Sequence, residues 1–84
     1  MWLIEDELHA EYQGEYPSRQ EAVAELRRRA DLPWDMPPNL CPCTAWRTCG
    51  RTYVLIERDR SGLESRELAL EVSASETKWH LASN

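Results

Sequence analysis

The residues most able to do chemistry in this chain are its three cysteines, Cys41, Cys43 and Cys49, at the spacing C-x-C-x5-C. Zinc in a closed site takes four sulfur or nitrogen ligands, which proteins usually supply from C-x2-C or H-x3-H pairs. The fourth ligand would have to be His9 or His80, and only if the fold brings one of them close. Because the usual spacing is missing, we assign no metal and no cofactor, and keep a structural zinc site on these thiols as an alternative.

A reactive thiol is a further alternative, with Cys49 as its candidate. Arg47 and Arg51 flank Cys49, and nearby cations favour the reactive thiolate. However, C-x-C is not the C-x-x-C motif of thiol oxidoreductases. The chain also has no glycine-rich phosphate loop, no G-x-S-x-G and no H-E-x-x-H. The simplest interpretation is that the cysteines pack as small apolar side chains. We therefore name no catalytic residue and favour a protein that is not an enzyme.

The segment around the cysteines, residues 31–53, is also rich in flat rings and fixed cations. It reads DLPWDMPPNLCPCTAWRTCGRTY, a composition that suits a packed, ordered connector. A loop of this length either contains a short element or has a function. Tryptophan, tyrosine and arginine are typical of interface hot spots and of ligand pockets, although the tryptophans could instead cap a small core. The candidate binding residues are Trp34, Trp46, Arg47, Arg51 and Tyr53.

The size and net charge of the chain indicate a single domain and argue against several kinds of partner. Its 84 residues suffice for a single domain, residues 1–84, with one layer of core. A net charge of −5 argues against direct binding to nucleic acid, which requires a basic face. No apolar run approaches the ~20 residues that cross a bilayer, and the N-terminus does not resemble a signal peptide. We therefore expect a cytoplasmic protein with no membrane partner. The odd number of cysteines argues against a disulfide framework, and reduced thiols fit that compartment.

The first element that must position these residues is predicted as a strand over residues 2–12. Apolar side chains such as Trp2 and Ile4 share one parity, which is typical of a strand with one buried face. Asp6 falls on the same parity. We interpret it as the site of a β-bulge or kink that resets the register, and keep an inward carboxylate with a role as the alternative. Gly14 is expected to end this strand.

One helix is predicted over residues 19–30, where Ser18 and Glu21 form a capping box and Pro33 prevents continuation. The predicted fold class is α+β: a mostly antiparallel four-stranded sheet with one helix packed on a face and a long ordered connector. The other three strands, each an alternating or continuous apolar run, are predicted over residues 51–59, 66–74 and 77–81.

The strand over residues 51–59 indicates self-association. Tyr53 and Leu55 point to one face, and Val54 and Ile56 point to the other, while one helix covers only one face. Either the connector folds over the second face of a monomer, or two copies pack about a two-fold axis. We favour the homodimer, because so short a chain gains much by sharing a core.

The connector contains the pattern W-x3-P-N-x2-P-C-x2-W-x2-C-G-R-x-Y, and Gly14, Pro17 and Ser18 precede the helix upstream of it. Together these residues resemble short uncharacterised bacterial proteins, some of them encoded on mobile gene cassettes. The resemblance implies a bacterial origin and an accessory role, and it implies no activity. The residues of the pattern are Trp34, Pro38, Asn39, Pro42, Cys43, Trp46, Cys49, Gly50, Arg51 and Tyr53.

The function that the sequence favours is a non-enzymatic binding module of a bacterial accessory protein. It would engage a protein or small ligand through residues 31–53, and the identity of that partner is not encoded in any motif. The alternative is the structural zinc site on Cys41, Cys43 and Cys49 with a histidine, or a small thiol enzyme.

Overall fold

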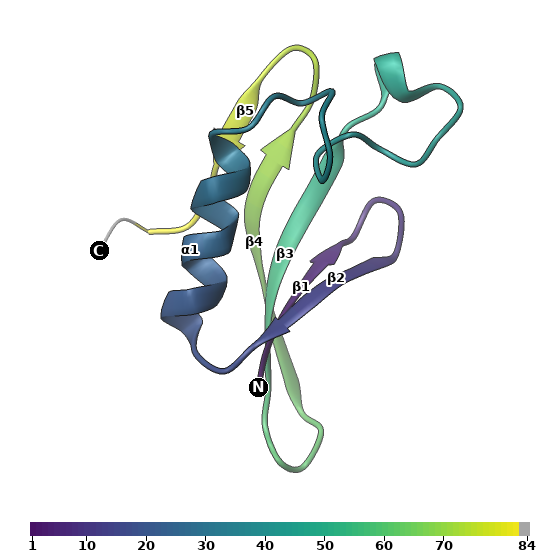
Figure 1. Cartoon of the computed structure of the whole chain (residues 1–84). Coiled ribbons are helices and arrows are strands. Elements are labelled where there is room, and N and C mark those ends of the chain that lie inside the picture. Colours follow the sequence, from purple (N-terminus) through teal and green to yellow (C-terminus); the bar gives the residue numbers. More distant parts are fainter. Residues whose placement is uncertain (83–84) are drawn as a thin grey trace.

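A computed structural model of the chain describes residues 1–82. Within these residues it contains one antiparallel sheet with the strand order β2-β1-β3-β4-β5, one α-helix and one short 3-10 helix (Figure 1). The α+β prediction is confirmed, but the sheet has five strands rather than the predicted four. The strands are β1 (Trp2–Asp6), β2 (Glu11–Tyr16), β3 (Arg51–Arg58), β4 (Glu64–Val72) and β5 (Thr77–Trp79), and the helices are α1 (Arg19–Ala30) and η1 (Trp46–Thr48).

The additional strand arises because the segment predicted as a single strand, residues 2–12, is a hairpin. Asp6 ends β1, and its carboxylate accepts a hydrogen bond from the backbone N–H of Leu8 at 3.1 Å. Ala10 then adopts the left-handed conformation, with φ 51°. An aspartate that bonds the backbone two residues ahead turns the chain without the help of glycine or proline.

The register of this hairpin corrects two expectations. Gly14, which we expected to end a strand, lies inside β2 with φ 133° and pairs with Ile4. The next pair is Glu5 with Tyr12, so the bulge lies on β2 and not at Asp6. Asp6 keeps the parity of Ile4 and is fully buried, which matches the inward carboxylate that we held as the alternative.

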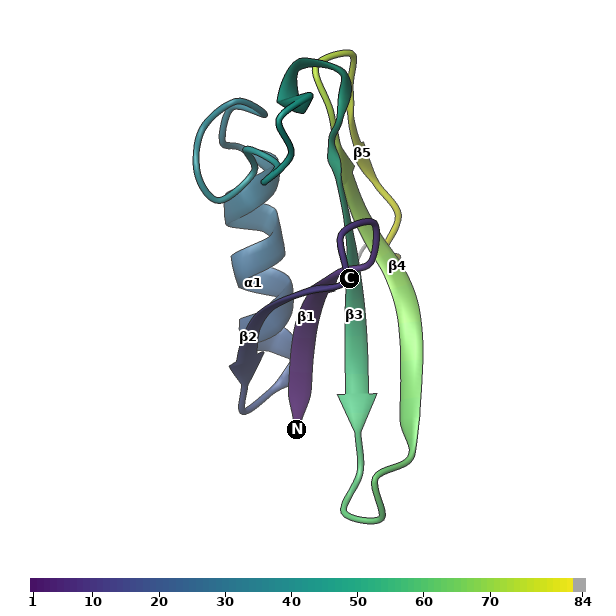
Figure 2. The ribbon, with the colours of Figure 1, turned by 90° about the vertical axis from the view of Figure 1, so that its right-hand side faces the viewer.

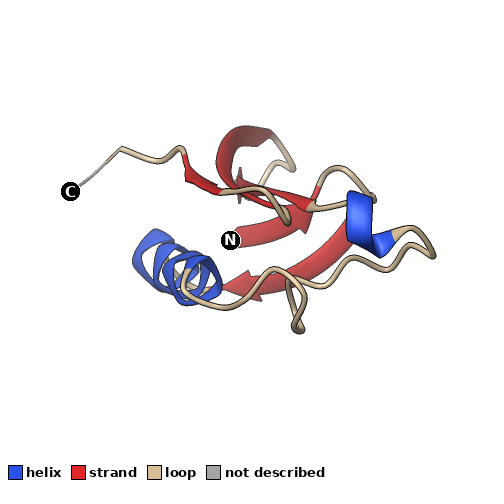
Figure 3. Cartoon of the chain, turned by 90° about the horizontal axis from the view of Figure 1, so that it is seen from above, coloured by secondary structure: helices blue, strands red, loops and turns tan. Residues whose placement is uncertain are grey.

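Helix α1 packs on one face of the sheet (Figure 3). Its predicted start is confirmed, because the hydroxyl of Ser18 accepts a hydrogen bond from the backbone N–H of Glu21 at 3.2 Å. No helix within residues 1–82 is long and apolar enough to cross a membrane. The core between the helix and the sheet consists of Ile4, Ala22, Leu26, Tyr53, Leu55, Ala69, Leu70, Val72 and Leu81.

The second face of β3 is already covered within one chain. Leu3, Val54 and Ile56 form a separate apolar cluster and are only 3–4% exposed. Arg66 lies opposite Ile56 on β4, and its guanidinium pairs with Glu5, so its aliphatic stem runs along this face. The apolar patch that motivated the homodimer is therefore buried in the monomer, and the homodimer stays an untested prediction.

The connector between α1 and β3 lies on the helix side of the sheet, at the C-terminal end of α1 (Figure 2). One buried amide orders it. The Nδ2 of Asn39 donates to the carbonyl oxygens of Arg29 at 2.8 Å and Leu32 at 3.2 Å. The Oδ1 of Asn39 accepts from the hydroxyl of Tyr53 at 3.0 Å. These bonds satisfy the end of the helix and fasten the connector to β3.

Replacing Ser18 tests the start of α1. Ser18→Ala removes the acceptor of the Glu21 N–H and should lower the free energy of unfolding by about 1 kcal/mol, measured by urea denaturation. Ser65→Ala, at an exposed position of β4, is the matched control and should change it by less than about 0.5 kcal/mol. Equal stability of Ser18→Ala and the wild type would contradict the assigned cap.

Candidate metal centre

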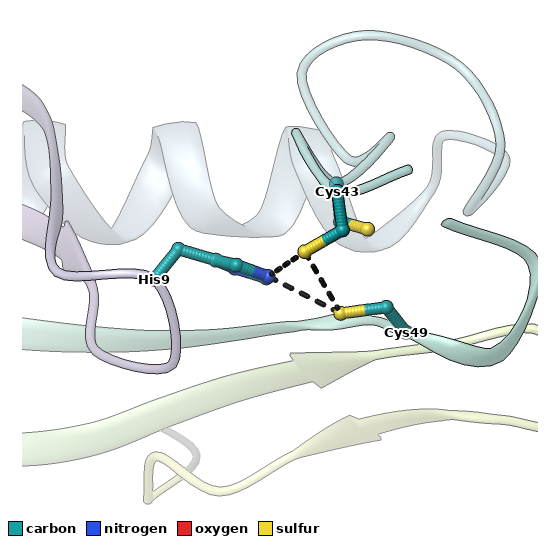
Figure 4. Close-up of side chains that lie close together, drawn as sticks. His9, Cys43 and Cys49 are labelled. Carbon is teal, nitrogen blue, oxygen red and sulfur yellow. Dashed lines mark hydrogen bonds between the residues drawn. The ribbon is translucent and has the colours of Figure 1, made fainter. Parts of the chain in front are cut away.

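His9, in the turn between β1 and β2, meets the three cysteines of the connector. Its Nε2 lies 3.0 Å from the Sγ of Cys43 and 3.2 Å from the Sγ of Cys49, and these two sulfurs are 3.6 Å apart (Figure 4). With the Sγ of Cys41, the four ligand atoms all lie within 4.8 Å of one another. Segments that are distant in the sequence thus place one imidazole and three thiols around a single point.

The spacing of three of these atoms, those of His9, Cys43 and Cys49, is close to the spacing around a tetrahedral zinc ion. With Zn–S bonds of about 2.3 Å and a Zn–N bond of about 2.0–2.1 Å, the edges of the tetrahedron are about 3.8 Å between sulfurs and about 3.6 Å between sulfur and nitrogen. The distances among His9, Cys43 and Cys49 fall about 0.2–0.6 Å below these edges, so the three side chains need only a small outward shift to hold the ion. Cys41 is buried and the side chain of His9 is 12% exposed, while Cys43 and Cys49 are partly exposed, so the group lies at the edge of the protein interior.

The backbone of the cysteine segment is fixed near both of its ends. The Nη2 of Arg51 donates to the carbonyl oxygen of Leu40 at 2.9 Å, directly before Cys41. At Gly50 the chain passes so close to β4 that a Cβ would lie 2.2 Å from the carbonyl oxygen of Val72. Only glycine fits there, and this close approach fixes the backbone one residue after the third thiol.

Asp6 contacts His9 at Nδ1, the ring nitrogen that does not face the thiols. Its Oδ2 lies 2.6 Å from the Nδ1 of His9 and accepts from the Nη1 of Arg51 at 2.8 Å. Its Oδ1 accepts from the backbone N–H groups of Leu8 and Thr52, each at 3.1 Å. The carboxylate is fully buried. The imidazole is therefore held between a carboxylate on one side and thiols on the other.

Without a cation, the geometry does not favour a reactive thiol. Burial, together with hydrogen bonds to Cys41 and Cys43, raises the pKa of Cys49 to about 11. Arg47, which we expected to favour the thiolate, lies over the ring of Trp46 at 4.7 Å instead. A thiol with a raised pKa is a poor nucleophile at neutral pH. A divalent cation among the sulfurs would reverse the shift, because a coordinating thiol loses its proton.

The predicted binding residues fall into two groups. Trp34 and Trp46 lie together on the connector, with ring centroids 5.6 Å apart, and Arg47 stacks on Trp46. Arg51 and Tyr53 instead point into the protein and are 7% and 0% exposed. The first group forms part of the surface of the connector, whereas the second supports the connector from inside.

The structure distinguishes the two histidines that the sequence left open. The Nε2 of His80 lies 2.7 Å from a carboxylate oxygen of Glu71, and His80 does not belong to the thiol cluster. His9 does, because the hairpin that was missed in the sequence turns it toward the connector. The signal that could have favoured His9 is Asp6, a carboxylate on the buried parity three residues before a potential ligand.

Comparison of the chain with protein-family models, with curated proteins and with solved structures finds no match. The resemblance to bacterial cassette-encoded proteins therefore stays a prediction.

Replacing Gly50 tests the close approach beside the third thiol. Gly50→Ala should lower the free energy of unfolding by about 1–3 kcal/mol, because the new Cβ overlaps the carbonyl oxygen of Val72. It should also speed the reaction of Cys49 with a thiol reagent, since the sulfur is displaced. Gly62→Ala, where nothing lies within 4 Å of the new Cβ, is the comparison and should strain only its own turn. Unchanged stability and thiol reactivity in Gly50→Ala would contradict the assigned packing.

Proposed function

We propose that this chain is a zinc-binding domain in which a centre of three cysteines and one histidine joins the connector to the β1–β2 hairpin. The observation that carries the proposal is the convergence of one imidazole and three thiols within 4.8 Å. The three separations among His9, Cys43 and Cys49 lie within about 0.6 Å of the edges of a zinc tetrahedron. The zinc site that was an alternative on sequence grounds thereby becomes the leading function.

The ligand set favours zinc in a structural role. Thiolate and imidazole are the ligands that zinc prefers, whereas magnesium and calcium prefer oxygen. Four protein ligands complete a tetrahedron and leave no open position for water or substrate, which separates a structural site from a catalytic one. The residues that would hold the ion are His9, Cys41, Cys43 and Cys49.

The centre would act chiefly on the connector. Between α1 and β3 the only regular element is the short helix η1. The backbone hydrogen bonds of helices and sheets therefore stabilise this part of the chain very little. When a site is assembled only in the folded chain, the free energy of metal binding adds to the free energy of folding. Zinc would therefore hold in place the surface that carries Trp34, Trp46 and Arg47.

Metal content and a pair of histidine variants test the proposal. Protein purified without chelators should contain about one zinc ion per chain, the stoichiometry of a closed site. His9→Ala removes a ligand and should weaken zinc binding by more than about 100-fold, beyond the loss typical of an outer-shell residue. His80→Ala removes a histidine that also pairs with a carboxylate but lies outside the cluster, and it should leave the affinity unchanged.

Competition with a chromophoric chelator measures these affinities, and elemental analysis measures the metal content. Iron or copper in place of zinc would identify another soft-ligand metal and contradict the zinc assignment. Protein that contains no metal and binds no added zinc, or equal zinc affinity of the two variants, would refute the centre itself.

A second candidate function is the non-enzymatic binding module, with the connector as its binding face. The observation that favours it is the exposed Arg47, which lies over the ring of Trp46, beside the tilted pair that Trp46 forms with Trp34. A bacterial accessory protein in the cytoplasm, where thiols stay reduced, is the setting that we propose for either function.

Replacing Trp46 and Arg47 together by alanine tests this module. The double variant should keep its zinc content but lose capture of a partner from a bacterial extract. Light scattering at micromolar concentration tests the predicted homodimer separately. Equal capture by the double variant and the wild type would place any binding face elsewhere.

A further inference from the structure

We infer that Asp6 is a positioning residue of the centre, which fixes His9 in the tautomer that presents Nε2 to the metal. The inference rests on the proposed zinc site and deepens it. Asp6 is fully buried, although a carboxylate is costly to remove from water and is no member of the ligand group. The cost of burying Asp6 therefore indicates that it has a role other than binding the metal.

The two ring nitrogens of His9 face different chemistry. Nδ1 lies 2.6 Å from the Oδ2 of Asp6, while Nε2 lies 3.0 and 3.2 Å from the sulfurs of Cys43 and Cys49. A neutral imidazole carries its proton on one nitrogen and offers a lone pair on the other. Three N–H groups, those of Leu8, Thr52 and Arg51, already donate to the Asp6 carboxylate, which thus acts as an acceptor toward Nδ1 as well. The proton is therefore held on Nδ1, and the lone pair of Nε2 faces the sulfurs.

The carboxylate is prevented from turning away. Its Oδ1 accepts from the N–H groups of Leu8 and Thr52, and the Nη1 of Arg51 donates to its Oδ2. The same guanidinium donates to the carbonyl oxygen of Leu40, the residue before the first cysteine. One buried arginine thus links the carboxylate that orients the histidine to the loop that carries the thiols.

An asparagine at position 6 would reverse this arrangement at nearly constant shape. The two backbone N–H groups require an acceptor, so the amide oxygen should occupy the place of Oδ1. The amide NH2 then faces the Nδ1 of His9 and can only donate, so the Nη1 of Arg51 loses this acceptor and keeps Glu11. Nδ1 must become the acceptor, which moves the proton to Nε2 and removes the lone pair that the metal needs.

The experiment measures the tautomer and the affinity in the same three proteins. Nitrogen-15 NMR of the imidazole reports which nitrogen of His9 is protonated, and chelator competition reports zinc affinity. The wild type should carry its proton on Nδ1. Asp6→Asn should show protonated Nε2 in the metal-free protein and bind zinc about 10–100-fold more weakly, the range for an outer-shell partner. Glu11→Gln, which removes another carboxylate bonded to Arg51 without touching His9, should match the wild type in both measurements.

A wild-type protein protonated at Nε2 would overturn the inference, as would an Asp6→Asn variant with unchanged tautomer and affinity. An equal loss of affinity in Glu11→Gln would also overturn it, because removal of charge near Arg51 would then suffice. If Asp6→Asn does not fold, the tautomer of the wild type decides the question. If the wild type binds no zinc, the proposed function fails, while the tautomer of the metal-free chain still tests the role of Asp6.

Discussion

The buried pair of Asp6 and Arg51 is the interaction on which the rest of the site depends. The two charged groups meet at 2.8 Å, and their side chains are 0% and 7% exposed. Removing two ions from water costs several kcal/mol for each, which is recovered only when both find further partners. Asp6 finds them in His9 and in two backbone N–H groups, and Arg51 finds them in Glu11 and in the carbonyl oxygen of Leu40. The pair therefore ties the β1–β2 hairpin, β3 and the connector together.

A zinc ion would reinforce the connector, the part of the chain that the apolar core holds least. The apolar core fixes the sheet and α1, and Trp34 of the connector packs against it. The remaining connector is positioned by polar contacts, notably those of Asn39 and Arg51, and by the close approach at Gly50. An ion held by His9 and three thiols would add strong bonds where regular backbone pairing is absent. The centre thus gives a small domain an ordered surface that its core alone would support weakly.

The sequence predicted the elements with strong local signals and missed those set by long-range contact. The Ser18 cap and the alternation of apolar residues were sufficient for α1, β3 and much of β4. The β1–β2 turn was missed because it contains no glycine or proline, and Asp6 and Ala10 form it through side-chain bonding and a left-handed backbone. The fifth strand and the position of His9 both follow from that turn.

The histidine ligand could not be chosen from the sequence, because its position depends on the β1–β2 turn that was missed. The three thiols were visible as candidates, but their C-x-C-x5-C spacing is not a usual zinc pattern, and either histidine was possible. His9 approaches Cys43 across 34 positions of the chain, and only the folded hairpin shows this contact. The prediction that Val54 and Ile56 need a second copy to cover them overlooked neighbouring side chains on the same face, including that of Arg66.

X-ray absorption spectroscopy at the zinc edge is the sharpest test of the zinc centre, because it reports the number and type of atoms bound to the metal in the intact protein. Zinc held by His9 and the three cysteines should show about three sulfur neighbours at about 2.3 Å and one nitrogen neighbour at about 2.0–2.1 Å. Protein that retains no zinc after purification and reconstitution, or a spectrum with only oxygen and nitrogen neighbours, would contradict it.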